Sequence, residues 1–453
     1  MLIGKVLNQL NSAARCIRVE IETQPQKLFH LARDWTEVLI TRQLCEPWFT
    51  EAPNRELETK LFRQAERIDD WTWRLRIRDD AYWSDGSLIT AEQLGRQVQK
   101  AHHARGAASV CTTHLRQIET ENSNSIKVTT RLPIGDVRRL LTCPSLGPVK
   151  DGEPISSGKY LLGDRTTSQI HLKHINGQAE VIAMTLSGDY RAETAVDHRS
   201  LDVTSLTTNT PVGRKAPGTQ QLLSSADLDI VVGLQLPTEF DDNMAEMIDH
   251  IIDRVALARE ALGMLRPITM VTDIWGNPNG KGCTQPRIKG AHLDDTWDFH
   301  YTDFRPNYEV ATEIRRQLLE TLGTQLRLVK IPYPDYLESR NTAARSAFRL
   351  ILVFPSWAHP SALLTQCYLR HLNDPLAPKG FLDHYARSVA SESVANATQH
   401  AMQAERHLSN IQRGYIPIAS LRSQLRSCVA VPWIPPCGWF DFSALAGGRV
   451  DGS

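Results

Sequence analysis

The sequence predicts an α/β protein with mixed sheets, and three observations support this class. Segments with strand pattern alternate with helical segments through most of the second half of the chain. Residues 348–354, FRLILVF, form a continuous apolar run, as expected of a strand that is buried on both faces. The chain has 453 residues, too many for one simple core, so we expect two or three lobes.

The first half contains a strand pattern rich in tryptophan. Residues 71–77, WTWRLRI, alternate strictly between two faces, and the pattern places Trp71 and Trp73 together on the apolar face. We therefore expect a half-buried strand in which both tryptophans belong to the core.

The phrase WSDGSLITAEQL follows that strand and carries very regular local signals. Asp85 and Gly86 predict a turn, because Asp bonds nearby backbone and Gly tolerates a positive φ. Thr90 is a predicted N-cap with Gln93 as its capping-box partner, and the helix should run to about His103. We interpret the phrase as a structural corner without a role in chemistry.

Apolar spacing predicts the remaining elements. The expected helices cover residues 31–46, 137–141, 241–265, 309–322 and 391–411. The expected strands cover residues 18–22, 125–130, 169–173, 180–186, 228–236, 325–331, 415–418 and 427–431. Gly323 should end the helix before it, and the Gly- and Pro-rich stretch 277–290 is the strongest internal boundary signal.

Composition argues against several functional classes. Lys and Arg together number 51, as do Asp and Glu, so the formal net charge is zero and nucleic acid is not favoured as a ligand. The start, MLIGKVLNQLNSAAR, lacks the unbroken apolar core of a secretory signal. No stretch reaches the roughly 20 apolar residues that span a bilayer. We expect a cytoplasmic protein without membrane insertion, and a periplasmic one only if the start of the chain is misassigned.

The sequence contains no recognisable catalytic or metal-binding motif. The eight cysteines are scattered without a C-x-x-C pair, so we expect mostly buried reduced thiols, no metal and no cofactor. Gly-rich nucleotide loops, H-E-x-x-H and G-x-S-x-G do not occur. We therefore expect a protein that is not an enzyme.

Candidates for ligand binding come from aromatic and polar residues near the ends of predicted strands, where ligands collect in α/β sheets. Trp357, after the buried strand, and Trp433, between prolines, are the expected stacking surfaces. The other candidates are the strand-end residues Tyr301, Arg305 and His359 and, on the first helix, Arg42 and Glu46. We expect Trp357→Ala to leave the fold intact and to weaken ligand binding.

Five segments together carry a resemblance to a known family. They are, in chain order, TWRLRIRDDAYWSDGSLITAEQL, ISSGKYLL, MIDHIIDRVALA, YTDFRPNYEVATEIRRQLLETLGTQLRLVKIPYPDYL and FRLILVFPSWAHPSALL. They resemble the family 5 extracellular solute-binding proteins, whose members bind oligopeptides, dipeptides or nickel complexes. In the last segment Arg349, Ala358 and His359 stand where the family has acidic residues, so a role in binding a peptide's charge is not carried over.

The C-terminal sequence resembles one branch of that family. Its end, with GWFDF at residues 438–442, is similar to the end of SgrR-type regulators. Those proteins are cytoplasmic and join a DNA-binding winged helix to a solute-binding domain. This chain begins almost directly at the binding domain, so we expect the DNA-binding part to be missing or separate.

The resemblance implies a two-lobed, periplasmic-binding-protein-like type II fold with a hinge. The implied division is lobe I, residues 1–262 plus 426–453 with a subdomain near 50–150, and lobe II, residues 263–425. The hinge would lie near Pro267 and at residues 416–427, and closure would bring both lobes onto the ligand.

The expected function is that of a cytoplasmic solute-binding protein that senses or carries a peptide-like or sugar-phosphate-like small molecule. Three alternatives stay open: the ligand-sensing part of an SgrR-like transcriptional regulator, the substrate-binding subunit of an ABC peptide transporter, and an enzyme reusing the cleft. The expected partners are a small-molecule ligand and, in the regulatory alternative, a DNA-binding domain or regulator.

Overall fold

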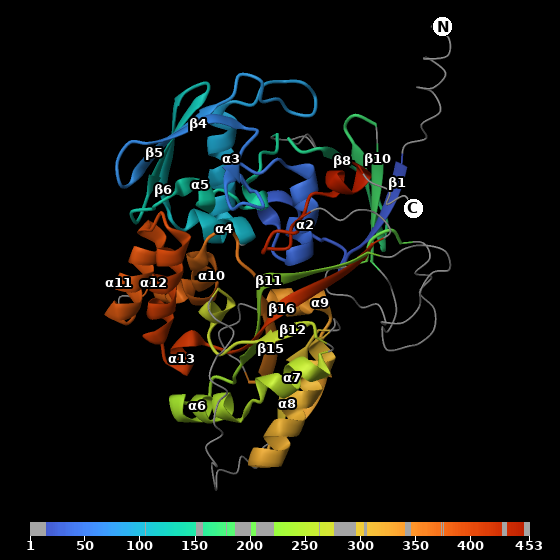
Figure 1. The fold of residues 1–453 in the computed structure, drawn as a ribbon, viewed down its shortest axis with the longest axis vertical. Helices are drawn as coiled ribbons and strands as arrows, with labels where there is room; N and C mark the ends of the chain where they lie inside the picture. Colours follow the sequence, from blue (N-terminus) through green and yellow to red (C-terminus); the bar gives the residue numbers. More distant parts are fainter. Residues whose placement is uncertain are drawn as a thin grey trace.

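The computed structural model describes residues 15–104, 106–150, 157–177, 179–185, 201–204, 222–261, 263–275, 296–302, 306–339, 346–372, 374, 376–427 and 433–447. Within these ranges the chain forms four β-sheets flanked by helices, which confirms the mixed α/β class. Two long strands, β11 (Leu222–Gln235) and β16 (Ile416–Ser427), lie side by side across the middle of the molecule (Figure 1).

The first sheet pairs the start of the described chain with a much later segment. Its order is β1 (Arg15–Glu20), β10 (Ala179–Met184), β9 (Gln169–His174) and β8 (Tyr160–Arg165), with β1 parallel to β10. Helix α2 (Trp35–Leu44) packs beside β8 and buries Val38 and Ile40 in the same core. The strands expected near residues 18, 169 and 180 are confirmed.

A second sheet is entirely antiparallel. Its order is β4 (Phe62–Arg67), β5 (Thr72–Ile77), β7 (Ser125–Thr130) and β6 (Leu115–Asn122). Helix α3 (Ala91–His103) packs against β6 and β7. The predicted capping box is confirmed, since Thr90 Oγ1 accepts from the Gln93 N–H at 3.4 Å and Gln93 Oε1 accepts from the Thr90 N–H at 2.9 Å.

The turn before this helix also forms as predicted. Gly86 has a φ of 82°, and Asp85 Oδ1 accepts from the Ser87 N–H at 2.9 Å. The core position expected for Trp71 is wrong, because β5 begins one residue later at Thr72 and leaves Trp71 44% exposed. Trp73 is buried as expected.

The third sheet has six strands and forms the centre of the second half. Its order is β12 (Leu265–Pro267), β16, β11, β15 (Phe348–Val353), β13 (Thr296–Tyr301) and β14 (Gln325–Lys330). Helix α8 (Asn307–Leu322) packs on β13 and β14, and Gly323 ends it with a φ of 71°, as predicted. The strand expected at residues 415–418 forms the start of the longer strand β16, and residues 428–431 of the strand expected at 427–431 lie outside the described residues.

The single helix expected over residues 241–265 is wrong. The structure has two helices there, α6 (Asp242–Ile251) and α7 (Arg254–Glu260), separated at Asp253. The Asp253 carboxylate accepts from the N–H groups of Val255 and Ala256, both at 3.0 Å, and so caps the second helix. Apolar spacing continues across the break, which is why periodicity alone missed it.

Three helices pack against one another (Figure 1), and the first of them also packs against β15. They are α10 (Pro360–Leu372), α11 (Lys379–Ala390) and α12 (Val394–Arg406), of which the sequence predicted only the last. The remaining short elements are η1 (Phe29–Leu31), β2 (Thr50–Glu51), β3 (Leu57–Glu58), α4 (Ala107–Thr112), α5 (Val137–Leu140), η2 (Pro144–Leu146), η4 (Val271–Ile274), α9 (Tyr333–Ser339), α13 (Asn410–Arg413) and η5 (Phe442–Gly447).

We call the two four-stranded sheets with α2 to α5 the N-terminal lobe, and the six-stranded sheet with its helices the large-sheet lobe. Strand pairing continues across the boundary expected at residue 262, since β11 pairs with β15, and the expected division stays a prediction. No helix in the described ranges is long and apolar enough to cross a membrane.

Candidate ligand site between the lobes

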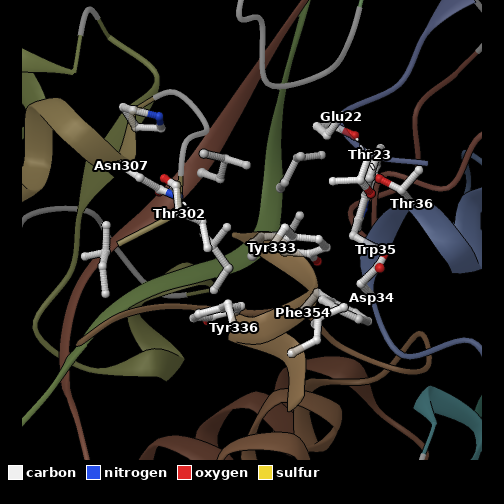
Figure 2. A pocket seen from close by; sticks show the side chains of 17 residues that line it. Glu22, Thr23, Asp34, Trp35, Thr36, Thr302, Asn307, Tyr333, Tyr336 and Phe354 are labelled. Carbon is white, nitrogen blue, oxygen red and sulfur yellow. Dashed lines mark hydrogen bonds between the residues drawn. The ribbon is translucent and has the colours of Figure 1, made fainter. Parts of the chain in front are cut away.

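A cavity of about 80 Å³ lies where the two lobes meet, and we call it the tyrosine cavity (Figure 2). Glu22 and Asp34 line it from the N-terminal lobe, after β1 and at the start of α2. Tyr333 and Tyr336 on α9, and Phe354 just after β15, line it from the large-sheet lobe. Residues from both lobes therefore line this one cavity.

Buried carboxyl groups surround the start of α2. Asp34 caps this helix, and its carboxylate accepts from the Glu37 N–H at 2.8 Å. Burial, and then the charge of Glu37, raises the pKa of Asp34 to about 8. The buried Glu37 carboxylate accepts from the N–H groups of Gln26, Lys27 and Arg33, at 3.0, 2.7 and 2.6 Å. The Glu37 carboxylate is therefore hydrogen-bonded within the protein.

A second cavity, of about 590 Å³, adjoins the first, and we call it the arginine cavity. Leu337 and Phe354 line both cavities. The basic residues among its described lining residues are Arg33, His102, His103 and Arg413, and no Asp or Glu accompanies them. The two cavities therefore present opposite charge to a ligand.

A third cavity, of about 490 Å³, lies beside the C-terminal segment, and we call it the tryptophan cavity. It brings together four residues that the sequence proposed for ligand binding: Arg42, Glu46, Trp357 and Trp433. Trp433 is 39% exposed, whereas Trp357 is 4% exposed and packs edge-on against His114 with ring centroids 5.2 Å apart.

The tryptophan cavity also carries a short ion pair. Lys159 Nζ lies 2.5 Å from Asp441 Oδ2. Burial acts to raise the pKa of Asp441, but Arg42 and Lys159 outweigh it and lower the pKa to about 2. Asp441 therefore stays ionised, and its charge is already compensated within the protein.

Aromatic contacts and one hydrogen bond separate the cavities. Trp35 lines the tyrosine cavity, and its indole N–H donates to the Cys437 carbonyl oxygen at 2.9 Å. Trp439 lines the tryptophan cavity and packs against Phe354. The C-terminal segment thus forms part of the wall between two cavities.

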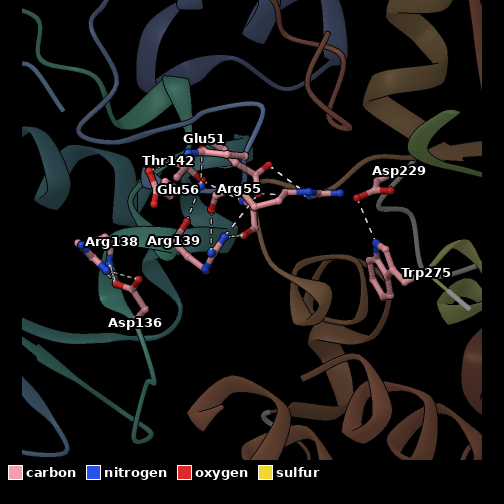
Figure 3. A network of polar contacts seen from close by, with 11 residues as sticks. Glu51, Arg55, Glu56, Asp136, Arg138, Arg139, Thr142, Asp229 and Trp275 are labelled. Atoms are coloured by element: carbon pink, nitrogen blue, oxygen red, sulfur yellow. Dashed lines mark hydrogen bonds and ion pairs between the residues drawn. The ribbon is translucent and has the colours of Figure 1, made fainter. Parts of the chain in front are cut away.

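A polar network ties the N-terminal lobe to the segment after β15 (Figure 3). The Glu51 carboxylate accepts from Arg55 at 3.2 Å and from Arg139 at 3.5 Å. Arg139 also donates to the Ala358 carbonyl oxygen at 3.4 Å, and the Ala358 N–H donates to Thr142 Oγ1 at 2.9 Å. These bonds hold the two lobes in register around the cavities.

Each of the three cavities is lined by at least one residue with a buried polar atom that has no partner among the described residues. These atoms include Thr23 Oγ1 in the tyrosine cavity, Gln235 Oε1 in the arginine cavity and Trp439 Nε1 in the tryptophan cavity. Because buried polar groups are nearly always hydrogen-bonded, such atoms at a cavity wall are suited to a ligand.

Three residues proposed from the sequence do not join this arrangement. Tyr301 is buried in the sheet with its ring 5.7 Å from that of Tyr308, and it lines none of the three cavities. His359 accepts from the Ser361 N–H at 3.1 Å at the start of α10, and burial, Arg139 and His114 lower the pKa of His359 to about 3. Arg305 lies outside the described residues.

Sequence reasoning missed the residues that give the tyrosine and arginine cavities their character. Tyr333 and Tyr336 sit three apart on a short helix, a spacing that places both on one face and was a usable signal. Glu22, Asp34 and Arg413 lie in loops or at helix ends and carried no pattern. The described part of the chain holds no group of three or more His, Cys, Asp or Glu suited to a metal ion.

No protein-family model and no curated protein matches the sequence. Solved structures do match the fold. The murein tripeptide binding protein MppA of Escherichia coli superposes with a TM-score of 0.73 at 15% identity, covering 91% of this chain and 94% of that one. NikA of Staphylococcus aureus, in complex with Ni(L-His)2, gives 0.76 at 12% identity, covering 96% and 100%.

OppA of Haemophilus influenzae, in complex with the peptide RPPGFSPFR, gives a TM-score of 0.73 at 14% identity, covering 96% of this chain and 99% of that one. These neighbours are family 5 solute-binding proteins, so the resemblance drawn from the sequence is confirmed at the level of the fold. The chain has the two-lobed fold of the periplasmic solute-binding proteins.

Proposed function

We propose that this protein is the substrate-binding subunit of a transporter and that it closes its two lobes on a small organic ligand. The observation that carries the proposal is the set of adjoining cavities between the lobes, each with at least one buried polar atom that lacks a partner among the described residues. A ligand that bonds these atoms would favour the closed arrangement, since it contacts both lobes only there.

The charges around the cavities favour a peptide-like ligand. Carboxyl groups line the tyrosine cavity and basic side chains line the arginine cavity, so a molecule with separated positive and negative groups matches both. Similar folds bind a murein tripeptide in MppA and a nonapeptide in OppA, which supports the same ligand class here.

The first experiment is native mass spectrometry of the purified protein, followed by thermal unfolding with a panel of di- and tripeptides and sugar phosphates. We expect a co-purified small molecule and a ligand-dependent rise in Tm, because a ligand that binds only the folded state stabilises it. The proposal would be refuted if no small molecule co-purifies and the Tm stays unchanged with every compound of the panel.

The variant Gln235→Leu tests whether the unpartnered oxygen of Gln235 binds the ligand. It removes an unpartnered buried amide oxygen, so we expect the free protein to gain stability while ligand binding weakens. Thr324→Val is the matched control, since Thr324 Oγ1 is also buried and unpartnered but lines none of the three cavities. It should alter stability in the same direction and leave ligand binding unchanged.

A second candidate is a cytoplasmic sensor whose ligand is read by a DNA-binding domain or a partner regulator. The similarity of the GWFDF ending to SgrR-type regulators favours it. Fractionation of cells that produce the native gene separates the two proposals: a periplasmic protein supports transport, and a cytoplasmic protein that co-purifies with a DNA-binding partner supports sensing.

A further inference from the structure

The tyrosine cavity is lined by carboxyl groups as well as by aromatic rings. Glu22 and Asp34 line it, and none of its described lining residues is Lys, Arg or His. Figure 2 shows Glu22, Asp34 and Trp35 on one side and Tyr333 and Tyr336 facing them. A cavity with carboxyl groups, no basic side chain and several aromatic rings is complementary to a cation.

The two tyrosine rings form a stacked pair beside these carboxyl groups. The Tyr333 and Tyr336 ring centroids lie 6.0 Å apart with planes at 18°. Arg349 places its guanidinium carbon 5.9 Å from the Tyr336 centroid, although it does not line the cavity. The ring of Tyr336 therefore already accepts one cation, as its negative π-face allows.

Size limits what the cavity holds. Its volume of about 80 Å³ is near half of the ~150 Å³ apolar cavity that binds one benzene molecule. A short aliphatic chain with a charged head fits this space, whereas a whole peptide does not. The rest of the ligand would extend past Phe354 into the arginine cavity, which shares this residue.

The charge state of Asp34 also favours a cation. Glu37 on the same helix and Glu22 after β1 are the charged groups acting on it, and with burial they raise the pKa of Asp34 to about 8. The empty cavity thus retains a proton near neutral pH. A cation placed beside Asp34 favours its ionised form, so binding of the cation is expected to release that proton.

We propose, building on the function proposed above, that the tyrosine cavity is the subsite for a small cationic group of the ligand, an ammonium on a short aliphatic chain. Glu22 and Asp34 supply the negative charge, the faces of Tyr333 and Tyr336 supply cation–π contact, and Thr23 Oγ1 accepts a hydrogen bond from the ammonium.

The test compares two probes of similar size, n-butylammonium and 1-butanol, by titration calorimetry of the full chain at pH 7. We expect the ammonium to bind at least tenfold more tightly than the alcohol. Glu22→Gln should weaken ammonium binding about tenfold and leave alcohol binding unchanged. Glu92→Gln is the matched control, because Glu92 is exposed on α3, where it pairs with Arg96, and lines none of the cavities.

Asp34→Asn provides a second readout that does not depend on affinity alone. Asn is as good an N-cap as Asp, so the helix start should persist. Titrations of the wild type in two buffers with different ionisation heats should reveal proton release with n-butylammonium, and this release should vanish in Asp34→Asn. Persistence of the release in the variant would overturn the role of Asp34.

The outcomes separate this inference from the proposed function. If 1-butanol binds as tightly as n-butylammonium, or if neither binds, the cationic subsite is wrong. A co-purified ligand found by native mass spectrometry would still support a solute-binding protein. A bound ligand without any cationic group would refute the cationic subsite alone. Only the failure to find any bound ligand would refute both the subsite and the proposed solute-binding function.

Discussion

Trp439 packs edge-on against Phe354, with ring centroids 5.8 Å apart and ring planes at 83°. Trp439 belongs to the C-terminal segment beside the N-terminal lobe, and Phe354 follows β15 in the large-sheet lobe. Phe354 also lines the tyrosine and arginine cavities, and Trp439 lines the tryptophan cavity. This aromatic contact is therefore the point where the three cavities meet.

The contact should be measurable as a coupling energy. In a double-mutant cycle with Phe354→Leu and Trp439→Phe, we expect an interaction of about 0.5–1.5 kcal/mol in the free energy of unfolding, measured in urea. A control cycle pairs Trp439→Phe with Phe381→Leu, a buried residue of α11 that has no ring contact with Trp439. We expect the stability effects in the control cycle to be additive. Additive effects of Phe354→Leu and Trp439→Phe as well would refute the coupling.

The two tryptophans of the tryptophan cavity should respond differently to truncation. Because Trp357 is 4% exposed, the earlier expectation that Trp357→Ala leaves the fold intact is revised to a loss of about 3–5 kcal/mol of stability. Trp433 is 39% exposed, so Trp433→Ala should change stability by about 0.5 kcal/mol or less. Urea unfolding measures both, and equal losses would contradict this assignment.

The capping box at the start of α3 should contribute measurably to the free energy of unfolding. Thr90→Ala removes the side-chain oxygen that accepts from the Gln93 N–H, so we expect a loss of about 1 kcal/mol in the free energy of unfolding. Thr398→Ala on α12 is the control, since its hydroxyl only bonds the Val394 carbonyl oxygen within the helix. A loss in the control as large as in Thr90→Ala would argue against a capping effect.

Asp229, on the strand β11, should make stability depend on pH. The residue is half-buried, and its carboxylate accepts from the Trp275 indole N–H at 3.1 Å (Figure 3). Burial raises the pKa of Asp229 to about 6, against the lowering effect of Trp275. Between about pH 4 and 6, Asp229 is therefore protonated in the folded state and ionised in the unfolded state. The contribution of Asp229 to the free energy of unfolding is complete below this window and is lost as the pH rises through it.

Asp229→Asn isolates this effect, because the amide keeps an acceptor for Trp275 and cannot ionise. The unfolding free energy of the variant relative to wild type should rise by up to roughly 3 kcal/mol between pH 4 and 7. Trp275→Phe removes the donor and should shift the wild-type window to higher pH. A difference between Asp229→Asn and wild type that does not vary with pH would show that Asp229 is ionised throughout.

Local signals in the sequence determined many elements of the fold. The turn at Asp85 and Gly86, the cap at Thr90 and the end of α8 at Gly323 each depend on backbone chemistry within a few residues. The same local chemistry was overlooked at Asp253, where a side-chain cap breaks a helix that apolar spacing extends without interruption.

The ligand site was decided by tertiary structure. The sequence placed Trp357 and Trp433 near strand ends and Arg42 and Glu46 on the first helix, and the fold brings these four to one cavity. It gave no signal that Glu22 would face Tyr333, because loops and helix ends far apart in the chain meet only when both lobes pack. Charge and burial at the cavities are properties of that packing, whereas caps and turns are properties of the chain itself.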